Sequence, residues 1–185
     1  MREYSKYQND VFNFITHGRG HAIIEAVAGS GKTSTIEEAL KRISPVSQVL
    51  VLAFNKHIAT ELQKRVPTHV EASTFNSFGF KIVKRNLPKV VLNQYKTDDI
   101  LKKMCADQKT YFKHKALISR LVSLFKSVES KDIEELASKY DLQLPTDTGF
   151  EPLFRQVFEA CMANKSIIDF DDQIYYPIAF DWHIP

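Results

Sequence analysis

The chain has few cysteines and no long hydrophobic run. Its 185 residues include only two cysteines, Cys105 and Cys161, which lie far apart in segments with helical periodicity. That placement favours buried, reduced thiols over a disulfide or a metal site. No stretch of about 18 apolar residues is present, which argues against a transmembrane helix. The N-terminus also lacks the apolar core of a secretion signal, so we expect a cytoplasmic protein with no membrane partner.

Metal-ligand spacing and internal repeats are missing as well. The six histidines form no pattern that a metal site would use, and no low-complexity segment is visible. Hydrophobic residues make up 44% of the chain. This content is enough to bury one core, or one core with a small appended subdomain.

Positive charge is concentrated in one segment, although the net charge is only +3. Residues 81–126 hold twelve lysines and arginines but only three acidic residues, so this segment carries +9 and the remainder carries −6. Four aromatic residues lie within it: Tyr95, Tyr111, Phe112 and Phe125. The combination suits a polyanion partner, and it is equally typical of a solvated helical surface whose aromatic residues face a core.

Residues 22–34 have the order of a phosphate-binding loop. An apolar run over 22–27 leads into a small-residue turn, and Gly31-Lys32-Thr33 opens a helical stretch. In such a loop the backbone N–H groups surround a phosphate, the lysine reaches its outer oxygens and the threonine hydroxyl ligates Mg²⁺. The usual pattern begins with glycine, whereas this chain has Ala26, which is small but less free to adopt positive φ. The alternative is an ordinary strand–turn–helix junction.

Strand and helix patterns alternate over the first 86 residues. We expect helices over 5–15, 33–43, 58–66 and 75–86, and strands over 22–27, 48–54 and 70–74. The strand over 48–54 is almost continuously apolar, as in a parallel strand that is covered on both faces. The alternation predicts βαβ units.

The pattern becomes helical from about residue 98 to residue 165. Breaks fall near Gln108, near Lys131 and at 144–146, and a short apolar return at 167–170 precedes a helix to about Phe180. The sequence therefore predicts an α/β fold in which a P-loop domain, formed by 1–86 and 166–185, is interrupted by an all-helical subdomain over 87–165.

Several motifs along the chain resemble those of UvrD/Rep-type superfamily 1 DNA helicases. Tyr7-Gln8 resembles the Q motif, and the other matches are 26–33 (Walker A), 52–56 (motif Ia), 73–79 (motif Ib) and 169–172 (an Asp-Phe-Asp-Asp segment). The form Ala-Phe-Asn-Lys is closest to the branch that includes the F-box DNA helicases and phage relatives. The resemblance implies a P-loop NTPase with a RecA-like parallel sheet, ATP and Mg²⁺ as cofactors, and catalytic roles for Lys32 and Thr33. It implies nucleotide contacts from Gln8, Ala28, Gly29, Ser30, Gly31, Lys32, Thr33 and Ser34.

Motifs Ia and Ib each lie where a strand ends and a helix begins, at the sheet edge where ligands of open α/β folds bind. Phe54 offers a flat face to an unpaired base, and Asn55 and Lys56 offer donors to phosphates. The resemblance implies DNA contacts from Phe54, Asn55, Lys56, Thr74, Phe75, Asn76 and Ser77. Asn76 departs from the family's histidine, and without the resemblance Phe54 would be interpreted as a core residue.

In the family, a strand with the Walker B acid follows the last motif seen here, and hydrolysis also requires arginines from downstream. Neither is found in the 185 residues, so we expect a sheet that is incomplete at the Walker B strand. The resemblance implies the N-terminal segment of an ATP-dependent 3′→5′ DNA helicase, with single-stranded DNA as its partner and duplex DNA at a fork as a further candidate. It would be a truncation, one half of a split enzyme completed by a second chain, or a remnant that binds without hydrolysis. The alternatives are a non-enzymatic nucleic-acid-binding or regulatory module and, less in keeping with motifs Ia and Ib, a P-loop kinase of small metabolites.

Overall fold

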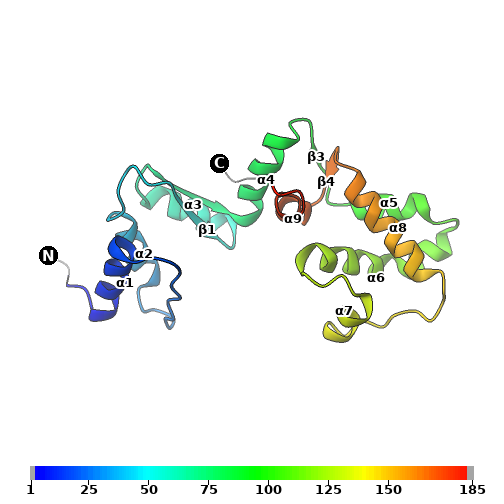
Figure 1. Ribbon diagram of the computed structural model, residues 1–185, viewed down its shortest axis with the longest axis horizontal. Coiled ribbons are helices and arrows are strands. Elements are labelled where there is room, and N and C mark those ends of the chain that lie inside the picture. The colour runs from blue at the N-terminus through cyan, green and yellow to red at the C-terminus, as the bar shows by residue number, and fades with distance from the viewer. Residues whose placement is uncertain (1–2, 183–185) are drawn as a thin grey trace. The chain divides into compact units, whose positions relative to one another are not determined.

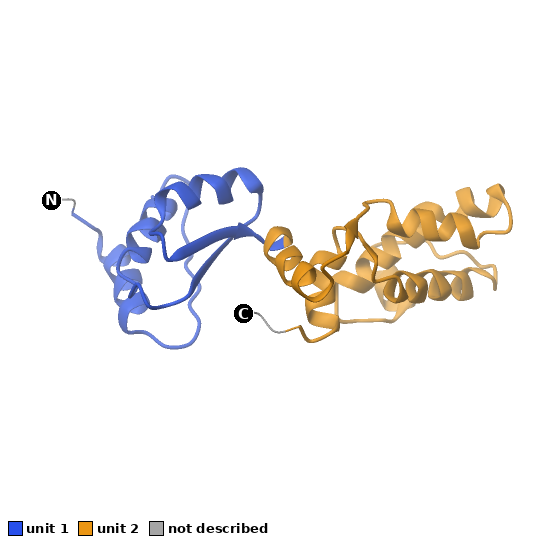
Figure 2. Cartoon of the chain, turned by 90° about the horizontal axis from the view of Figure 1, so that it is seen from above, with its two compact units in different colours: residues 1–75 blue, residues 76–185 orange. Residues whose placement is uncertain are grey.

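The computed structural model describes residues 3–182 and divides the chain into two compact units, Met1–Phe75 and Asn76–Pro185. Figure 1 labels the helices and strands, and Figure 2 colours the two units. The expected division into a P-loop domain over 1–86 and 166–185 and a helical subdomain over 87–165 stays a prediction.

Over its described residues, 3–75, unit 1 combines three helices with a parallel strand pair. Its elements in chain order are α1 (Lys6–His17), α2 (Lys32–Leu40), β1 (Val49–Ala53), α3 (Lys56–Arg65) and β2 (Val70–Thr74). β1 and β2 pair in parallel, with Val49 opposite Val70 and Ala53 opposite Thr74. α3 connects the strands and packs against both of them. The predicted βαβ unit over 48–74 is therefore confirmed.

The core of unit 1 lies on one face of this strand pair. Leu40 of α2 packs there with Val66 and Val70, and a second buried group comprises Ala53, Ala59 and Leu62. The opposite face is open, because Leu50 and Leu52 of β1 are 37% and 36% exposed. The prediction that this strand is covered on both faces is wrong for the described residues.

The predicted strand over 22–27 is also wrong. In the structure this segment has no strand pairing, and Ile23 is 92% exposed. A strand needs a neighbour that takes up its backbone N–H and C=O groups. Among the described residues the sheet of unit 1 consists of β1 and β2 alone, and 22–27 pairs with neither of them. The RecA-like P-loop sheet consequently stays a prediction.

Unit 2 is mainly helical. Its elements are α4 (Phe75–Asn86, which begins on the last residue of unit 1), β3 (Val91–Leu92), α5 (Lys96–Met104), α6 (Gln108–Ser127), α7 (Ile133–Lys139), α8 (Phe150–Ala163), β4 (Ile167–Ile168) and α9 (Asp172–Ala179). Helices α5 to α8 enclose a core centred on Leu121, Phe125 and Phe154. The helical stretch and its breaks are confirmed. The short parallel pair of β3 and β4 is a feature that the sequence analysis misses.

α4 and α9 approach each other closely within unit 2. A Cβ atom on Gly79 of α4 would lie 2.1 Å from the carbonyl oxygen of Gln173 and 2.9 Å from its carbonyl carbon. Both are backbone atoms, which cannot move aside as a flexible side chain can. Glycine at this position is therefore a requirement of helix packing.

Two lysines of the basic segment lie inside unit 2. The ammonium of Lys96 donates to Asp172 at 2.7 Å and to the Tyr176 hydroxyl at 2.8 Å, and that of Lys126 contacts Asp169 at 2.6 Å and Asp172 at 2.9 Å. Burial alone would lower the pKa of Lys126, but the charges of Asp172 and Asp169 raise it above its ordinary value. These two charges are therefore structural. Lys96 and Lys126 therefore belong neither to a surface that contacts a polyanion nor to a solvated surface.

The remaining expectations from composition can be compared with residues 3–182. Cys161 is buried on α8 as predicted, whereas Cys105 after α5 is only half-buried, and both thiols are free. Burial raises the pKa of the Cys161 thiol. Within the described residues no helix is long and apolar enough to cross a bilayer, and no three His, Cys, Asp or Glu side chains are grouped as metal ligands.

Candidate functional site

The turn before α2 has the backbone of a tight loop. The Ser30 N–H donates to the Val27 carbonyl at 3.3 Å, and Gly29 and Gly31 have φ of 78° and 80°. An added Cβ atom would meet nothing within 4 Å at either glycine. The left-handed backbone, rather than a lack of space, is therefore what requires glycine at these two positions.

α2 begins without a side-chain cap. Gly31 is its N-cap residue and has no side chain to accept a bond from the first turn. The first N–H groups of a helix have no partner within it, and they point out of its N-terminal end together with the positive end of the helix dipole. Lys32, Thr33 and Ser34 thus present backbone donors where the loop turns, an arrangement that favours an anion.

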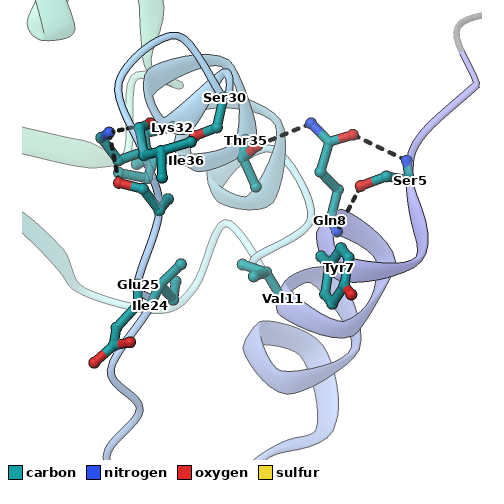
Figure 3. Close-up of a pocket in the computed structure, with 12 residues that line it drawn as sticks. Ser5, Tyr7, Gln8, Val11, Ile24, Glu25, Ser30, Lys32, Thr35 and Ile36 are labelled. Atoms are coloured by element: carbon teal, nitrogen blue, oxygen red, sulfur yellow. Dashed lines mark hydrogen bonds between the residues drawn. The ribbon is translucent and has the colours of Figure 1, made fainter.

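The Lys32 side chain folds over the loop. Its ammonium donates to the carbonyl oxygens of Ala26 at 2.9 Å and Val27 at 2.8 Å (Figure 3). An ammonium has three hydrogens, so the third has no part in these two bonds. The lysine is held at the mouth of the loop, close to the N-terminus of α2.

A pocket of about 440 Å³ lies beside this lysine. Its walls come from α1 and the residue before it (Ser5, Tyr7, Gln8, Val11), from the loop (Ile24, Glu25, Ala26, Val27, Ser30) and from α2 (Lys32, Thr35, Ile36). Figure 3 shows Gln8 and Tyr7 on α1 and Lys32 on the loop side. Tyr7 is 81% exposed, so its ring is available to a ligand. The pocket combines an aromatic ring, a carboxamide and a cation.

Gln8 connects α1 to α2. Its carboxamide oxygen accepts from the Ser5 N–H at 3.0 Å, and the Ser5 hydroxyl accepts from the Gln8 N–H at 3.3 Å, which forms a capping box on α1. Its amide nitrogen donates to the Thr35 hydroxyl at 3.0 Å. The Gln8 side chain, for which a nucleotide contact is predicted, is therefore fixed on two sides.

The structure separates Thr33 from this pocket. Thr33 lines a smaller hollow of about 190 Å³, together with Glu37 and Arg65, which form an ion pair at 3.3 Å. Glu61 also lines it, and its bond from Lys64 at 2.8 Å lowers the pKa of the Glu61 carboxyl. The role of Thr33 as the Mg²⁺ ligand stays a prediction.

The ends of β1 and β2 lie at the same edge because the strands are parallel and in register at Ala53 and Thr74. Phe54 follows β1 and is 95% exposed, so it is not a core residue. Phe75 follows β2 and is also exposed. Unit 1 thus carries two exposed aromatic rings at one strand edge.

Asn55 and Asn76 are among the predicted DNA-contact residues that already have structural partners. Asn55 caps α3, since its side-chain oxygen accepts from the Ile58 N–H at 2.9 Å. Asn76 belongs to unit 2, where its amide donates to the Phe170 carbonyl at 3.0 Å. Lys56 starts α3, and Ser77 lies in the first turn of α4. Their DNA contacts stay predictions.

Comparison with known proteins decides the family. The family model described as the UvrD/REP helicase N-terminal domain matches residues 7–181 of this chain. The chain belongs to this helicase family. A stretch of 70 residues is also 39% identical to an ATP-dependent helicase/nuclease subunit from Lactobacillus johnsonii. This stretch covers 36% of the present chain and 6% of that protein, so the chain spans only a small part of its relative.

The structure brings together some of the residues that the sequence predicts for this helicase domain. Gln8, Ser30 and Lys32 line one pocket, although Gln8 lies 24 positions before Lys32. Ala28, Gly29, Gly31 and Ser34 shape the loop and the helix start without lining it. Tyr7 and Thr35 also line the pocket, and the sequence patterns assign neither of them a nucleotide contact. Tyr7 could have been found from its place beside Gln8 in the Q motif, whereas Thr35 gives no signal before its bond to Gln8 is seen.

Proposed function

We propose that this chain is the ATP-binding, single-stranded-DNA-contacting N-terminal segment of an ATP-dependent 3′→5′ DNA helicase. The observation that carries the proposal is the position of Lys32. It lies at an uncapped helix N-terminus, in a loop with two left-handed glycines, beside a pocket that also contains Gln8. The 3′→5′ polarity of translocation and the assignment to the branch of the F-box and phage helicases rest on the resemblance alone.

The loop supplies the phosphate contacts in this proposal. The carbonyls of Ala26 and Val27 hold the Lys32 ammonium until a nucleotide binds, and phosphate oxygens then compete for its hydrogens. A charged acceptor forms a stronger bond than a neutral carbonyl, so the exchange favours the nucleotide. Mg²⁺ would be held by the Thr33 hydroxyl and would neutralise phosphate charge.

The pocket supplies the base contacts. The Gln8 carboxamide has one further hydrogen and one further lone pair beyond its bonds to Thr35 and Ser5, and these match the N7 acceptor and N6 donor of adenine. The exposed Tyr7 ring offers a stacking surface in the same pocket. ATP is therefore the nucleotide that the side chains favour.

The strand edge of unit 1 supplies the DNA contacts. Phe54 and Phe75 would each stack on an unpaired base, and Asn55, Lys56 and Thr74, followed by Asn76 and Ser77 at the start of unit 2, would bind the sugar-phosphate backbone. Lys102, Lys103 and Lys109 of unit 2 are exposed and would add phosphate contacts. Hydrolysis would need a Walker B acid and arginines, which a further segment or a second chain would supply.

Titration of a fluorescent ATP analogue with Mg²⁺ tests the nucleotide proposal. The wild-type chain should bind it, Lys32→Ala should bind at least about tenfold more weakly, and Lys41→Ala should bind like wild type because Lys41 is an exposed lysine at the far end of α2. The chain by itself should turn over ATP negligibly, with or without DNA. Equal affinity in wild type and Lys32→Ala would contradict the proposal, and DNA-stimulated turnover that Lys32→Ala abolishes would show that an acid within these residues completes the site.

A further inference from the structure

A short chain of hydrogen bonds joins Gln8 to the phosphate loop through Thr35. The Gln8 amide nitrogen donates to the Thr35 hydroxyl at 3.0 Å (Figure 3). That hydroxyl donates to the Gly31 carbonyl at 3.0 Å. The same carbonyl accepts from the Thr35 N–H at 2.9 Å. Thr35 thus contacts both the residue proposed to read the base and the glycine at which α2 begins.

The donor and the acceptor of each of these hydrogen bonds follow from the groups at the two ends of the series, the Gln8 carboxamide and the Gly31 carbonyl. A carbonyl oxygen only accepts, so the Thr35 hydroxyl must give its hydrogen to Gly31 and can only accept from Gln8. The Gln8 side chain must therefore direct its NH₂ group, and not its oxygen, toward Thr35. At the other end of the carboxamide, the Ser5 N–H donates to an atom 3.0 Å away, and this atom must be the oxygen because only the oxygen accepts. Ser5 and Thr35 therefore select the same orientation of the Gln8 carboxamide.

The two bonds differ in their exposure to water. Thr35 is only 8% exposed, whereas the bond from Ser5 lies at the exposed start of α1. Water competes for an exposed hydrogen bond more than for a buried one, so the Thr35 hydroxyl is the stronger restraint on the carboxamide.

We propose that Thr35 is a positioning residue for base selection: its hydroxyl fixes the Gln8 carboxamide so that the nucleotide site prefers adenine to guanine. A fixed carboxamide presents one N–H and one oxygen lone pair to the pocket. Adenine offers the complementary N7 acceptor and N6 donor, whereas guanine offers two acceptors, N7 and O6, one of which would face the carboxamide oxygen. The inference rests on the proposed ATP site and names the device that selects its base.

The test compares three ligands on a small set of variants. ATP, GTP and inorganic tripolyphosphate, each with Mg²⁺, are titrated by calorimetry into wild type, Thr35→Val, Thr35→Ser, Gln8→Met and the Thr35→Val, Gln8→Met double variant. Thr35→Val keeps the side-chain volume and loses the hydroxyl, while Thr35→Ser keeps the hydroxyl. Thr35→Ala serves as a second hydroxyl-free variant if Thr35→Val does not fold.

Wild type should prefer ATP to GTP, and Thr35→Val should lose about three- to tenfold of that preference, the range for one hydrogen bond. Its tripolyphosphate affinity should stay within about twofold of wild type, since the loop still holds Lys32. Thr35→Ser should keep the preference. In the Gln8→Met background, Thr35→Val should cause no further loss, because Thr35 acts through Gln8.

Three results in the variants would overturn the inference. The first is a ratio of ATP affinity to GTP affinity that is the same in Thr35→Val as in wild type. The second is a loss of this ratio on Thr35→Val that is as large in the Gln8→Met background as in the wild-type background. The third is a fall in the tripolyphosphate affinity of Thr35→Val that is as large as its fall in ATP affinity. A wild-type chain that binds tripolyphosphate through Lys32 but shows no base preference would also overturn it, while leaving the phosphate site intact. Failure of the proposed function is recognised separately, as absence of ATP and tripolyphosphate binding in wild type.

Discussion

Several residues that face a proposed ligand also hold the fold together. Gln8 caps α1, Asn55 caps α3, and Asn76 fastens the start of α4 to the Phe170 carbonyl. Substitution of any of these would change the structure as well as the binding. Phe54 is different, because its ring is 95% exposed and contributes little to the core of unit 1.

Phe54→Ala should weaken binding of single-stranded DNA by about 1–3 kcal/mol, the loss of one base stack. The melting temperature should hardly change, because an exposed ring contributes little to stability. Fluorescence anisotropy with a labelled oligothymidine measures the affinity, and Phe54→Trp, which keeps a flat ring, is the matched control. Unfolding of Phe54→Ala, or full affinity in this variant, would remove Phe54 from the DNA contacts.

At the scale of elements, the helices could be predicted from local sequence patterns, because a helix depends mainly on interactions between residues that are close in the sequence. The helices over 75–86 and 108–127 follow from their periodicity and, for the second, from the Asp107 cap, whose oxygen accepts from the Thr110 N–H. The segment 22–27 has the composition of a strand, but pairing depends on contact with a neighbouring strand, and within the described residues 22–27 pairs with neither β1 nor β2. Composition alone could not reveal this.

Contacts between distant positions also escaped the sequence analysis. Lys96 and Lys126 read as part of a basic surface, yet their carboxylate partners lie 76 and 43 positions further along the chain. Gln8 and Thr35 are 27 positions apart, and each is an ordinary helix residue in isolation. Only the packing of segments that are distant in the sequence makes these pairs visible.

Gly79→Ala should destabilise unit 2 by about 1–3 kcal/mol, in spite of alanine's higher helix propensity. Its Cβ atom would overlap the Gln173 carbonyl, so α4 and α9 would have to separate. Trp182 is the single tryptophan of the chain and lies 5.3 Å from the Phe180 ring after α9, so its fluorescence during urea denaturation reports this unit.

Gly149→Ala is the control for this substitution. Its Cβ atom would meet only the Asp147 side chain at 3.6 Å, an ordinary contact, and φ at this residue is −83°. The midpoint of the urea transition should therefore change much less than in Gly79→Ala. Equal midpoints in the two variants would show that α4 and α9 are not in close contact.

On the scale of the whole chain, the +9 segment divides into charges with different surroundings. Lys96 and Lys126 are buried. Lys113 pairs with Asp147 at 2.8 Å and Lys115 with Asp98 at 3.0 Å, and both pairs are partly exposed. Lys102, Lys103 and Lys109 are exposed side chains on α5 and at the start of α6, which makes them the best candidates for contacts with phosphate.

Reversal of Lys102, Lys103 and Lys109 to glutamate should weaken DNA binding to all sequences alike. The slope of log affinity against log salt should fall by up to about two, since each phosphate contact to a single strand contributes about 0.7. Lys6, Lys41 and Lys64 reversed together form a control with the same change in net charge. Equal affinity for DNA in wild type and in the Lys102, Lys103 and Lys109 variant would make this segment a solvated surface.

The central claim is that the loop before α2 and the adjoining face of α1 bind a nucleotide. Hydrogen exchange of the backbone amides with and without MgATP locates such a site directly. Exchange should slow in peptides that cover 26–34 and 5–11, because phosphate oxygens occupy the loop N–H groups and the base covers the start of α1. The effect should disappear in Lys32→Ala. Unchanged exchange in 26–34 at saturating MgATP, or equal protection in Lys32→Ala, would contradict the account.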